Sequence, residues 1–335
     1  IKPILKNTRH LYFNLPFFSH FLKKWINSGI LQDSVVNKTK EWFHLGLKMW
    51  GISRDKPYFG FKIPRFLNKY FYVWLDAPIG YISTFKNLCN KNSNLDFDEL
   101  WGLSSKYELY HFIGKDIIYF HTLFWPAILE ASSLRKPNGI FVHGYLTING
   151  LKLSKSRGSL IKAKDWLKYF DSDSLRYYLA SKLSNNINDI EIDLKDFMNK
   201  INNDIVNNLV NLAARSASFI NNVFNDCLSD SLDNIELYQY FIKKSYIIEK
   251  LLDNRDFSSV IRLSMMLVDE ANQYINVNKP WILVKNDVNK IKLHKISTLG
   301  INFFRIVMIF LKPIVPDLAI RTESFLMIKL NWKSI

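Results

Sequence analysis

The spacing of apolar residues changes along the chain and divides it into segments of different character. In residues 1 to about 70, apolar positions recur at helical spacing after Asn14 and again from Ser34 to Trp50, which predicts two helices. The aromatic segment PYFGFKIP, punctuated by proline and glycine, ends this region. We interpret residues 1–70 as the end of a larger unit.

Three later stretches predict strands. YFYVWL (70–75) is aromatic and β-branched and precedes Asp-Ala-Pro, so we expect a buried strand that ends at a turn. ELYHFIGKD predicts a strand to Ile113, a break at Gly114 and a helix over about 116–130, and GIFVHGYLTI (139–148) predicts a third strand. Strands alternating with helices predict a parallel sheet with ligands at the carboxyl ends of its strands. Functional residues are therefore expected within 76–81, 114–116 and 143–145.

The remaining pattern is mostly helical. Two helical stretches, 163–170 and 173–183, follow a basic loop, and strand signals largely stop after about residue 205. Further helices are expected at 205–224, 236–252, 257–277, 291–310 and after Pro316. Their connections have the lengths found in bundles, so the sequence predicts an all-helical C-terminal domain.

The charge balance adds a class of partner. The 45 Lys and Arg residues exceed the 30 Asp and Glu residues and give a net charge of +15. Such a surplus is typical of proteins that bind polyanions such as nucleic acids or nucleotides. A composition rich in Lys, Asn and Ile also follows from codon bias, so the charge favours RNA binding without deciding it.

The cysteine content, the apolar runs and the first residue indicate the cellular compartment and whether the chain is a fragment. The two cysteines, Cys89 and Cys227, match no zinc-site spacing and form no disulfide framework, as in a reducing compartment. No uninterrupted apolar run approaches the roughly 18 residues of a membrane span, and the first residues lack a signal-peptide pattern, so we expect a cytoplasmic protein. The first residue is Ile rather than Met, which suggests a fragment.

The loop GLKLSKSRGS (150–159) combines three cations with three serines and two glycines. Taken alone it predicts a solvated basic turn. Together with four other segments, it resembles the methionyl-tRNA synthetases, a family of class I aminoacyl-tRNA synthetases. The resemblance rests on WLDAPIGY (74–81), HFIGKDIIYFH (111–121), FVHGYLTINGLKLSKSRG (141–158), DSLRYYL (173–179) and NLAARSASF (211–219) in this order.

The resemblance implies an α/β plus all-α fold. Residues 1–70 correspond to the end of an inserted connective domain, and 71–145 to the second half of a Rossmann-like catalytic domain. Residues 146–205 correspond to the KMSKS loop and a stem-contact region, and 206–335 to the anticodon-binding bundle. The family's two-histidine signature and cysteine-rich zinc knuckle have no counterpart in these residues, so the chain resembles the later part of the enzyme.

The implied reaction uses ATP with Mg2+ to activate methionine and then passes the methionyl group to tRNA. Its first step needs positioned positive charge on a triphosphate, which flexible lysines supply. By the resemblance Lys155 and Lys152 contact the phosphates, and Ser154 lets the backbone approach them. Arg54 matches a family arginine near the adenylate. A surface ion pair between Arg54 and the adjacent Asp55 is the alternative.

Six residues match the family's methionine pocket, where an unbranched thioether is selected by shape and by contact with aromatic rings. Plain core packing is the alternative explanation for each of them taken singly. They are Trp74, Ala77, Pro78, Tyr81, Ile117 and His121.

Four residues match the nucleotide end of the site. Gly114 allows close approach of the backbone, and Asp116 can accept a hydrogen bond from a ribose hydroxyl, although it also fits a helix N-cap. His143 and backbone groups near Leu146 are expected beside adenine, with a satisfied core histidine as the alternative for His143.

The helical domain is expected to read the anticodon. Asn211 and Arg215 are four residues apart and so share a helix face, where they offer an amide for base edges and a guanidinium for stacking or phosphate. Trp281 is the candidate stacking platform, and a buried bundle residue is the alternative.

The resemblance implies tRNA(Met) and initiator tRNA, methionine and ATP as partners, no membrane, and room for a homodimer through a C-terminal extension that this chain does not contain. We expect this part alone to be inactive. Two alternatives stay open: a non-catalytic tRNA-binding module, and a related class I synthetase for valine, isoleucine or leucine.

Overall fold

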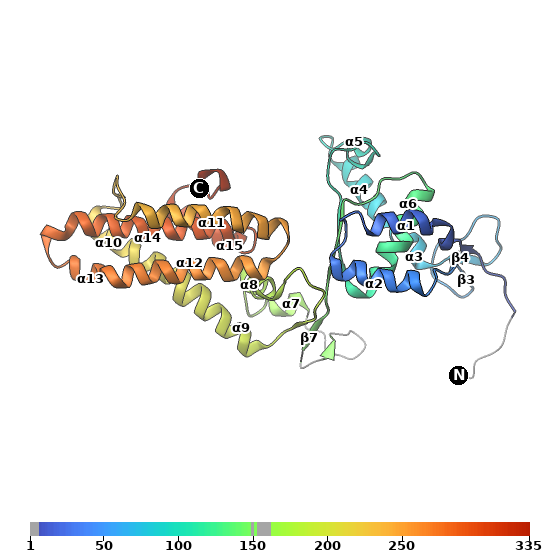
Figure 1. Cartoon of the computed structure of the whole chain (residues 1–335), viewed down its shortest axis with the longest axis horizontal. Helices are drawn as coiled ribbons and strands as arrows, with labels where there is room; N and C mark the ends of the chain where they lie inside the picture. Colours follow the sequence, from blue (N-terminus) through green and yellow to red (C-terminus); the bar gives the residue numbers. More distant parts are fainter. Residues whose placement is uncertain (1–6, 149–150, 153–161) are drawn as a thin grey trace. The chain divides into compact units, whose positions relative to one another are not determined.

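The computed structural model describes residues 7–148, 151–152 and 162–335, which form two compact units (Figure 1). Unit 1 extends to Gly144 and includes Asn186–Asn188, and unit 2 comprises Tyr145–Asn185 and Asp189–Ile335. The finer four-part division expected from the sequence remains a prediction.

Unit 1 begins with two helices and two antiparallel hairpins. Strand β1 pairs with β2, and β3 pairs with β4. Helix α2 ends at His44 rather than at Trp50, because Gly46 has a positive φ of 80° and turns the chain toward β2. The elements are β1 (Tyr12–Phe13), η1 (Leu15–Phe18), α1 (Ser19–Ile26), α2 (Asp33–His44), β2 (Trp50–Gly51), β3 (Ser53–Asp55) and β4 (Lys69–Phe71).

The prediction of a buried strand over YFYVWL is wrong. Strand β4 ends at Phe71, and α3 (Val73–Asp76) follows it, with no fully buried residue in either element. Aromatic residues favour strands because they fit a pleated, half-buried surface. That preference depends on context, and a packing contact with another part of the chain can outweigh it. Here the helical turn lays the Trp74 ring flat on Phe120, with 3.9 Å between ring centroids.

The parallel pairing predicted for the next two strands is confirmed. Strands β5 and β6 are parallel, with Tyr110 opposite Gly139 and Gly114 opposite His143, and Leu31 makes a parallel bridge to Ile140. Buried apolar residues of α1, α2, β5, β6 and α6 form the core around this pair. The elements are α4 (Ile79–Lys91), α5 (Phe97–Trp101), β5 (Tyr110–Gly114), the 3-10 turn η2 (Lys115–Ile117), the π-helix η3 (Phe120–Phe124), α6 (Trp125–Ala131) and β6 (Gly139–His143).

Unit 2 opens with a small mixed sheet. GIFVHGYLTI is not one strand, because β6 ends at His143 and β7 belongs to unit 2. Strand β7 lies between β8, which is antiparallel to it, and β9, which is parallel to it. The elements are β7 (Leu146–Ile148), β8 (Leu151–Lys152), α7 (Ala163–Trp166), α8 (Ser172–Lys182), β9 (Ile190–Glu191) and α9 (Leu194–Lys200).

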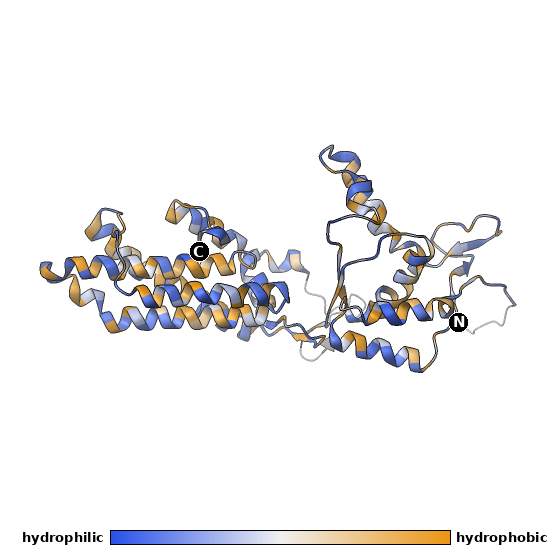
Figure 2. Cartoon of the chain, turned by 45° about the horizontal axis from the view of Figure 1, so that its top comes forward, coloured by the Kyte–Doolittle hydropathy of each residue, from blue (hydrophilic) through white to orange (hydrophobic). Residues whose placement is uncertain are grey.

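The all-helical prediction is confirmed for residues 201–335. Long helices enclose an apolar core, and polar and apolar residues alternate along them (Figure 2). Helix α14 is long and apolar enough to cross a membrane, but 78% of its apolar window is buried, as in the core helix of a bundle. The elements are the π-helix η5 (Ile201–Val210), α10 (Asn211–Phe224), α11 (Ile235–Asp253), α12 (Phe257–Asn278), α13 (Pro280–Leu283), η6 (Asp287–Asn289), α14 (Lys290–Leu311), α15 (Pro316–Leu326) and η7 (Trp332–Ser334).

Candidate functional site

In unit 1, residues of α3, α4 and η3 form an aromatic wall. The ring of Trp74 stacks on Phe120 with an angle of 9° between planes, and His121 lies edge-on to Trp74 at 6.1 Å. These contacts bring together two of the six residues that match the methionine pocket. Trp74 is half-buried and packs against the small core of Phe124 and Trp125, so both the pocket role and the core-packing alternative stay predictions.

A hydrogen bond joins Tyr81 to His121 and fixes which atom carries the proton. The Tyr81 hydroxyl lies 2.9 Å from His121 Nε2, and His121 Nδ1 lies 3.1 Å from the carbonyl oxygen of Ile117. Since a carbonyl oxygen only accepts, Nδ1 is protonated and donates to it. Burial lowers the pKa of His121, which favours the neutral ring with a lone pair on Nε2. The Tyr81 hydroxyl is therefore the donor to His121.

Two residues beside Tyr81 had not been assigned from the sequence. The rings of His111 and Trp125 lie 4.9 Å and 6.5 Å from the Tyr81 ring, and both residues are buried. Strand alternation in β5 puts His111 on the buried face with Ile113, and Trp125 follows His121 by four helical positions. These spacings were readable from the sequence.

His111 also lines a cavity of about 750 Å3 between α4 and β5. Ala77 and Tyr81 line the same cavity, which has the size of a small-molecule site. The Nε2 atom of His111 is buried without a hydrogen-bond partner among the described residues. Burial, reinforced by His121, lowers the pKa of His111 to about 4, so the ring is neutral at pH 7. At this end of the cavity the wall therefore presents two neutral polar groups, His111 and Tyr81, while Lys91 brings a positive charge to the lining.

The remaining matches to the pocket flank this wall. Pro78 is buried, Ala77 is exposed at the cavity, and Ile117 is half-buried and supplies the carbonyl that orients His121. Ring contacts, hydrogen bonds and the shared cavity thus bring five of the six residues into one neighbourhood, and Pro78 directly precedes the first residue of α4.

The carboxyl ends of β5 and β6 hold the residues expected at the nucleotide. A side chain on Gly114 would place its Cβ 2.8 Å from Asp116 Oδ1 and 4.0 Å from His143 Cε1. A larger residue at this position would have to displace the Asp116 carboxylate, whereas glycine leaves it in place. The N-cap interpretation of Asp116 is wrong, because Gly114 occupies the N-cap position and Asp116 lies within η2. His143 is exposed, so it is not a satisfied core histidine.

The ion pair considered between Arg54 and Asp55 is not the arrangement found. Asp55 bonds to Lys69 and to Thr8, each at 2.6 Å, and these two partners lower its pKa to about 2. The Arg54 guanidinium instead lies 3.9 Å from the centroid of the Tyr72 ring and donates to the carbonyl oxygen of Ser53 at 2.8 Å. Its position is therefore fixed by an aromatic face and the backbone.

Four further candidates belong to unit 2 or lie outside the described residues. Leu146 is in β7 opposite Ile190, and Lys152 is in β8 opposite Thr147. Ser154 and Lys155 lie outside the described residues. The role expected for these lysines remains a prediction.

In unit 2, two of the residues expected to read RNA are in contact. The Arg215 guanidinium lies 5.1 Å from the centroid of the Trp281 ring, and its Nη2 donates to Asn276 Oδ1 at 2.7 Å. Trp281 is 41% exposed, so it is not a buried bundle residue. Asn211 begins α10 and is exposed one helical turn before Arg215. A polar and aromatic face therefore spans α10, α12 and α13.

Among residues 7–148, 151–152 and 162–335, no three His, Cys, Asp or Glu side chains gather as a metal ion would require.

Comparison with known proteins decides the family. The model of the family "tRNA synthetases class I (M)" matches residues 1–217, well over half of the chain. The chain belongs to this synthetase family. The match includes the aromatic wall, the carboxyl ends of β5 and β6, and Arg215.

The curated relatives of this synthetase chain are bacterial. It is 69% identical over 334 residues to a methionine--tRNA ligase of Buchnera aphidicola subsp. Acyrthosiphon pisum (strain Tuc7). The aligned region covers 100% of this chain and 61% of that relative. It is 60% identical over 333 residues to the methionine--tRNA ligase of the subspecies Baizongia pistaciae (strain Bp). The chain spans about three fifths of the length of these relatives.

Solved structures share the fold. Methionyl-tRNA synthetase of Mycobacterium tuberculosis in complex with methionyl-adenylate has a TM-score of 0.81 at 23% identity, covering 93% of this chain and 62% of the other. The apo form of that enzyme gives a TM-score of 0.79 at 21% identity. The chain therefore has a class I synthetase fold with mostly helical content.

Proposed function

We propose that the chain is part of the core of a methionine--tRNA ligase that activates methionine with ATP and transfers it to tRNA(Met). The relatives that support this carry that name at up to 69% identity over the whole chain. One observation carries the proposal furthest: the six residues from Asp116 to His121 connect the carboxyl end of β5, where we place the nucleotide, to the pocket of Trp74 and Tyr81. Both substrates of the activation step then meet across one helical turn.

The activation step needs in-line geometry and no covalent enzyme intermediate. A methionine carboxylate oxygen attacks the α-phosphorus of ATP, the bond to the bridging oxygen breaks, and pyrophosphate leaves with that electron pair. We assign Lys155 and Lys152 to the phosphates, with Ser154 beside them and Mg2+ carried by ATP. Arg54 stabilises the adenylate, and Gly114, Asp116, His143 and Leu146 hold the nucleoside.

The pocket selects methionine mainly by shape. The Tyr81 hydroxyl is already committed as donor to His121, so the wall presents aromatic faces and weak polar tips to the thioether. A hydrophobic wall distinguishes one aliphatic side chain from another only modestly. Contact between the methionine sulfur and aromatic rings adds binding energy that an aliphatic side chain lacks. Trp74, Ala77, Pro78 and Ile117 complete the wall.

The second step transfers the methionyl group to a ribose hydroxyl of the terminal adenosine of tRNA, and AMP leaves. Arg215, Trp281 and Asn211 would select the tRNA by its anticodon, because unpaired bases are recognised by stacking and by hydrogen bonds to their edges. Initiator tRNA carries the same anticodon chemistry. A homodimer formed through further sequence is compatible with this assignment.

Charging of tRNA tests the proposal. We call a chain extended to the full length of the curated relatives the extended chain. The extended chain should charge tRNA(Met) with methionine far faster than with leucine, isoleucine or valine, and the 335-residue chain should bind the tRNA without charging it. A preference for a branched amino acid would establish the related synthetase instead.

A tRNA-binding module without catalysis is the second candidate, favoured by the basic charge of +15. It requires that the extended chain bind tRNA(Met) and form no adenylate. Reading the coding sequence before Ile1 separates the two, since an open frame that encodes the family's two-histidine signature supports the enzyme.

A further inference from the structure

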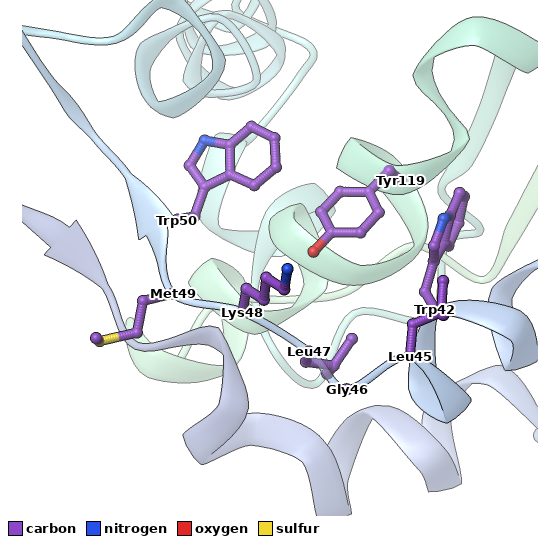
Figure 3. Close-up of a pocket in the computed structure, with 8 residues that line it drawn as sticks. All are labelled: Trp42, Leu45, Gly46, Leu47, Lys48, Met49, Trp50 and Tyr119. Atoms are coloured by element: carbon purple, nitrogen blue, oxygen red, sulfur yellow. The ribbon is translucent and has the colours of Figure 1, made fainter.

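Unit 1 contains a second cavity, of about 440 Å3, that includes no residue of the proposed methionine or nucleotide sites. We call it the aromatic cavity. It lies between the end of α2, the loop before β2 and Tyr119, and its lining includes Trp42, Leu47, Lys48 and Trp50 (Figure 3).

Three aromatic rings make a continuous wall of this cavity. The Tyr119 ring lies 4.9 Å from Trp42, nearly perpendicular to it, and 5.3 Å from Trp50 at an angle of 32°. All three residues are only half-buried, so the rings remain partly open to the cavity. Such a wall suits a flat aromatic ligand, because each nucleobase has a π-face that stacks on aromatic rings.

One charged side chain lines the cavity. Lys48 extends from the loop toward Tyr119 in Figure 3 and is exposed, and no carboxylate is among the lining residues. A lysine ammonium at the rim of an aromatic wall complements an anionic group attached to a flat ring. An aromatic wall together with one lysine fits a nucleobase that carries a phosphate better than it fits an uncharged aromatic molecule.

We propose that the aromatic cavity binds a nucleoside 5′-monophosphate unit, with the base stacked on the Trp42 ring and bordered by Tyr119 and Trp50, and with the phosphate at Lys48. The volume fits, since small-molecule sites span roughly 300–1,000 Å3. The same chemistry is present in a free mononucleotide and in an unpaired nucleotide of RNA. This site is separate from the one in the proposed function, so either can fail alone.

Equilibrium dialysis of the 335-residue chain tests the proposal with AMP, adenosine, inorganic phosphate and a 5′-phosphorylated single-stranded trinucleotide as probes. AMP should bind about threefold more tightly than adenosine at low salt, because an exposed charge pair contributes little more than this. Inorganic phosphate alone should bind weakly. Trinucleotide binding at least tenfold tighter than AMP would identify RNA as the source, and equal or weaker binding would identify the free nucleotide.

Two variants locate the binding. Trp42→Ala should weaken AMP and trinucleotide about tenfold, as loss of base stacking does. Lys48→Gln, which changes an exposed residue and leaves the fold intact, should remove the preference for AMP over adenosine. Lys40→Gln is the matched control, because Lys40 is exposed on α2 outside the cavity lining and should change nothing.

The proposal is overturned if no probe binds at millimolar concentration, or if Lys48→Gln keeps the full preference for AMP. It is also overturned if Asp116→Ala abolishes AMP binding while Lys48→Gln leaves it unchanged. The last result would place the nucleotide at the carboxyl end of β5, so the proposed function would survive the loss of this inference.

Discussion

The Tyr81 hydroxyl donates a hydrogen bond to His121 Nε2 across 2.9 Å, and the Ile117 carbonyl holds the opposite ring nitrogen. Tyr81 comes from α4 and His121 from η3, so this bond fixes two elements that wall the proposed methionine pocket. The π-helical turn that carries His121 is a rare conformation often found at functional sites.

Removing the Tyr81 hydroxyl should weaken methionine binding. Tyr81→Phe keeps the ring but leaves His121 Nε2 buried without a donor, at a cost of about 1–3 kcal/mol. In the extended chain we expect the KM for methionine to rise about tenfold while kcat changes less, since the reacting carboxylate lies at the other end of the substrate. Tyr246→Phe, at an exposed position in unit 2, is the control. An unchanged KM would rule out this role.

The buried His111 should make unit 1 less stable in mild acid. Its pKa is about 4 in the folded chain and about 6.5 when unfolded, so the unfolded state binds more protons between these values. The free energy of unfolding should therefore fall as pH drops from about 6.5 to about 4, by up to about 3 kcal/mol, and then level off.

Hydrogen exchange of the β5 and β6 amides across this pH range measures the effect, with His111→Gln as the comparison. The variant carries no titrating group at this position, so its stability should fall less steeply. Equal slopes in the two proteins would show that His111 does not contribute to the pH dependence.

Trp281 should serve RNA recognition and not the fold. The ring is 41% exposed and in contact with Arg215, and loss of base stacking costs about 1–3 kcal/mol. Trp281→Ala should weaken binding of an anticodon stem-loop to the 335-residue chain about tenfold and leave adenylate formation by the extended chain unchanged. Tyr246→Ala on α11 is the aromatic control. Loss of both activities would mean that the bundle had unfolded.

Gly300 should be required for the contact between α10 and α14. An added Cβ would lie 2.1 Å from Ser216 Oγ and 3.0 Å from Ser216 Cβ, and rotation of the Ser216 side chain would relieve only the first contact. Gly300→Ala should lower the free energy of unfolding by about 2 kcal/mol, although alanine is the better helix former. The double variant with Ser216→Gly should recover part of this loss in urea unfolding. A more stable single variant would contradict the steric argument.

Long periodic helices and the strand β5 were predictable from the sequence, because their signals are local. Helices α11, α12 and α14 begin and end within about two residues of the expected positions, and β5 ends at Gly114, one residue after the expected end at Ile113. YFYVWL failed because the stacking of Trp74 on Phe120 decides its conformation, and that partner is 46 positions away in the chain.

Partners of charged and polar side chains were the least predictable part of the site. Arg54 is followed in sequence by Asp55, yet its guanidinium packs on the Tyr72 ring. The pairing of β3 with β4 places Asp55 opposite Lys69, and these two residues form the ion pair. Asn276 was not anticipated as the partner of Arg215, since the residues are 61 positions apart and meet only when α10 packs beside α12.

Methionine-dependent exchange of pyrophosphate into ATP tests the central claim most directly. The extended chain should catalyse this exchange with methionine, and Lys155→Ala should slow adenylate formation by far more than it weakens methionine binding, because a phosphate contact acts in the transition state. An extended chain without methionine-dependent exchange would contradict the assignment as a methionine--tRNA ligase. Equal effects of Lys155→Ala on rate and on methionine binding would contradict the phosphate role.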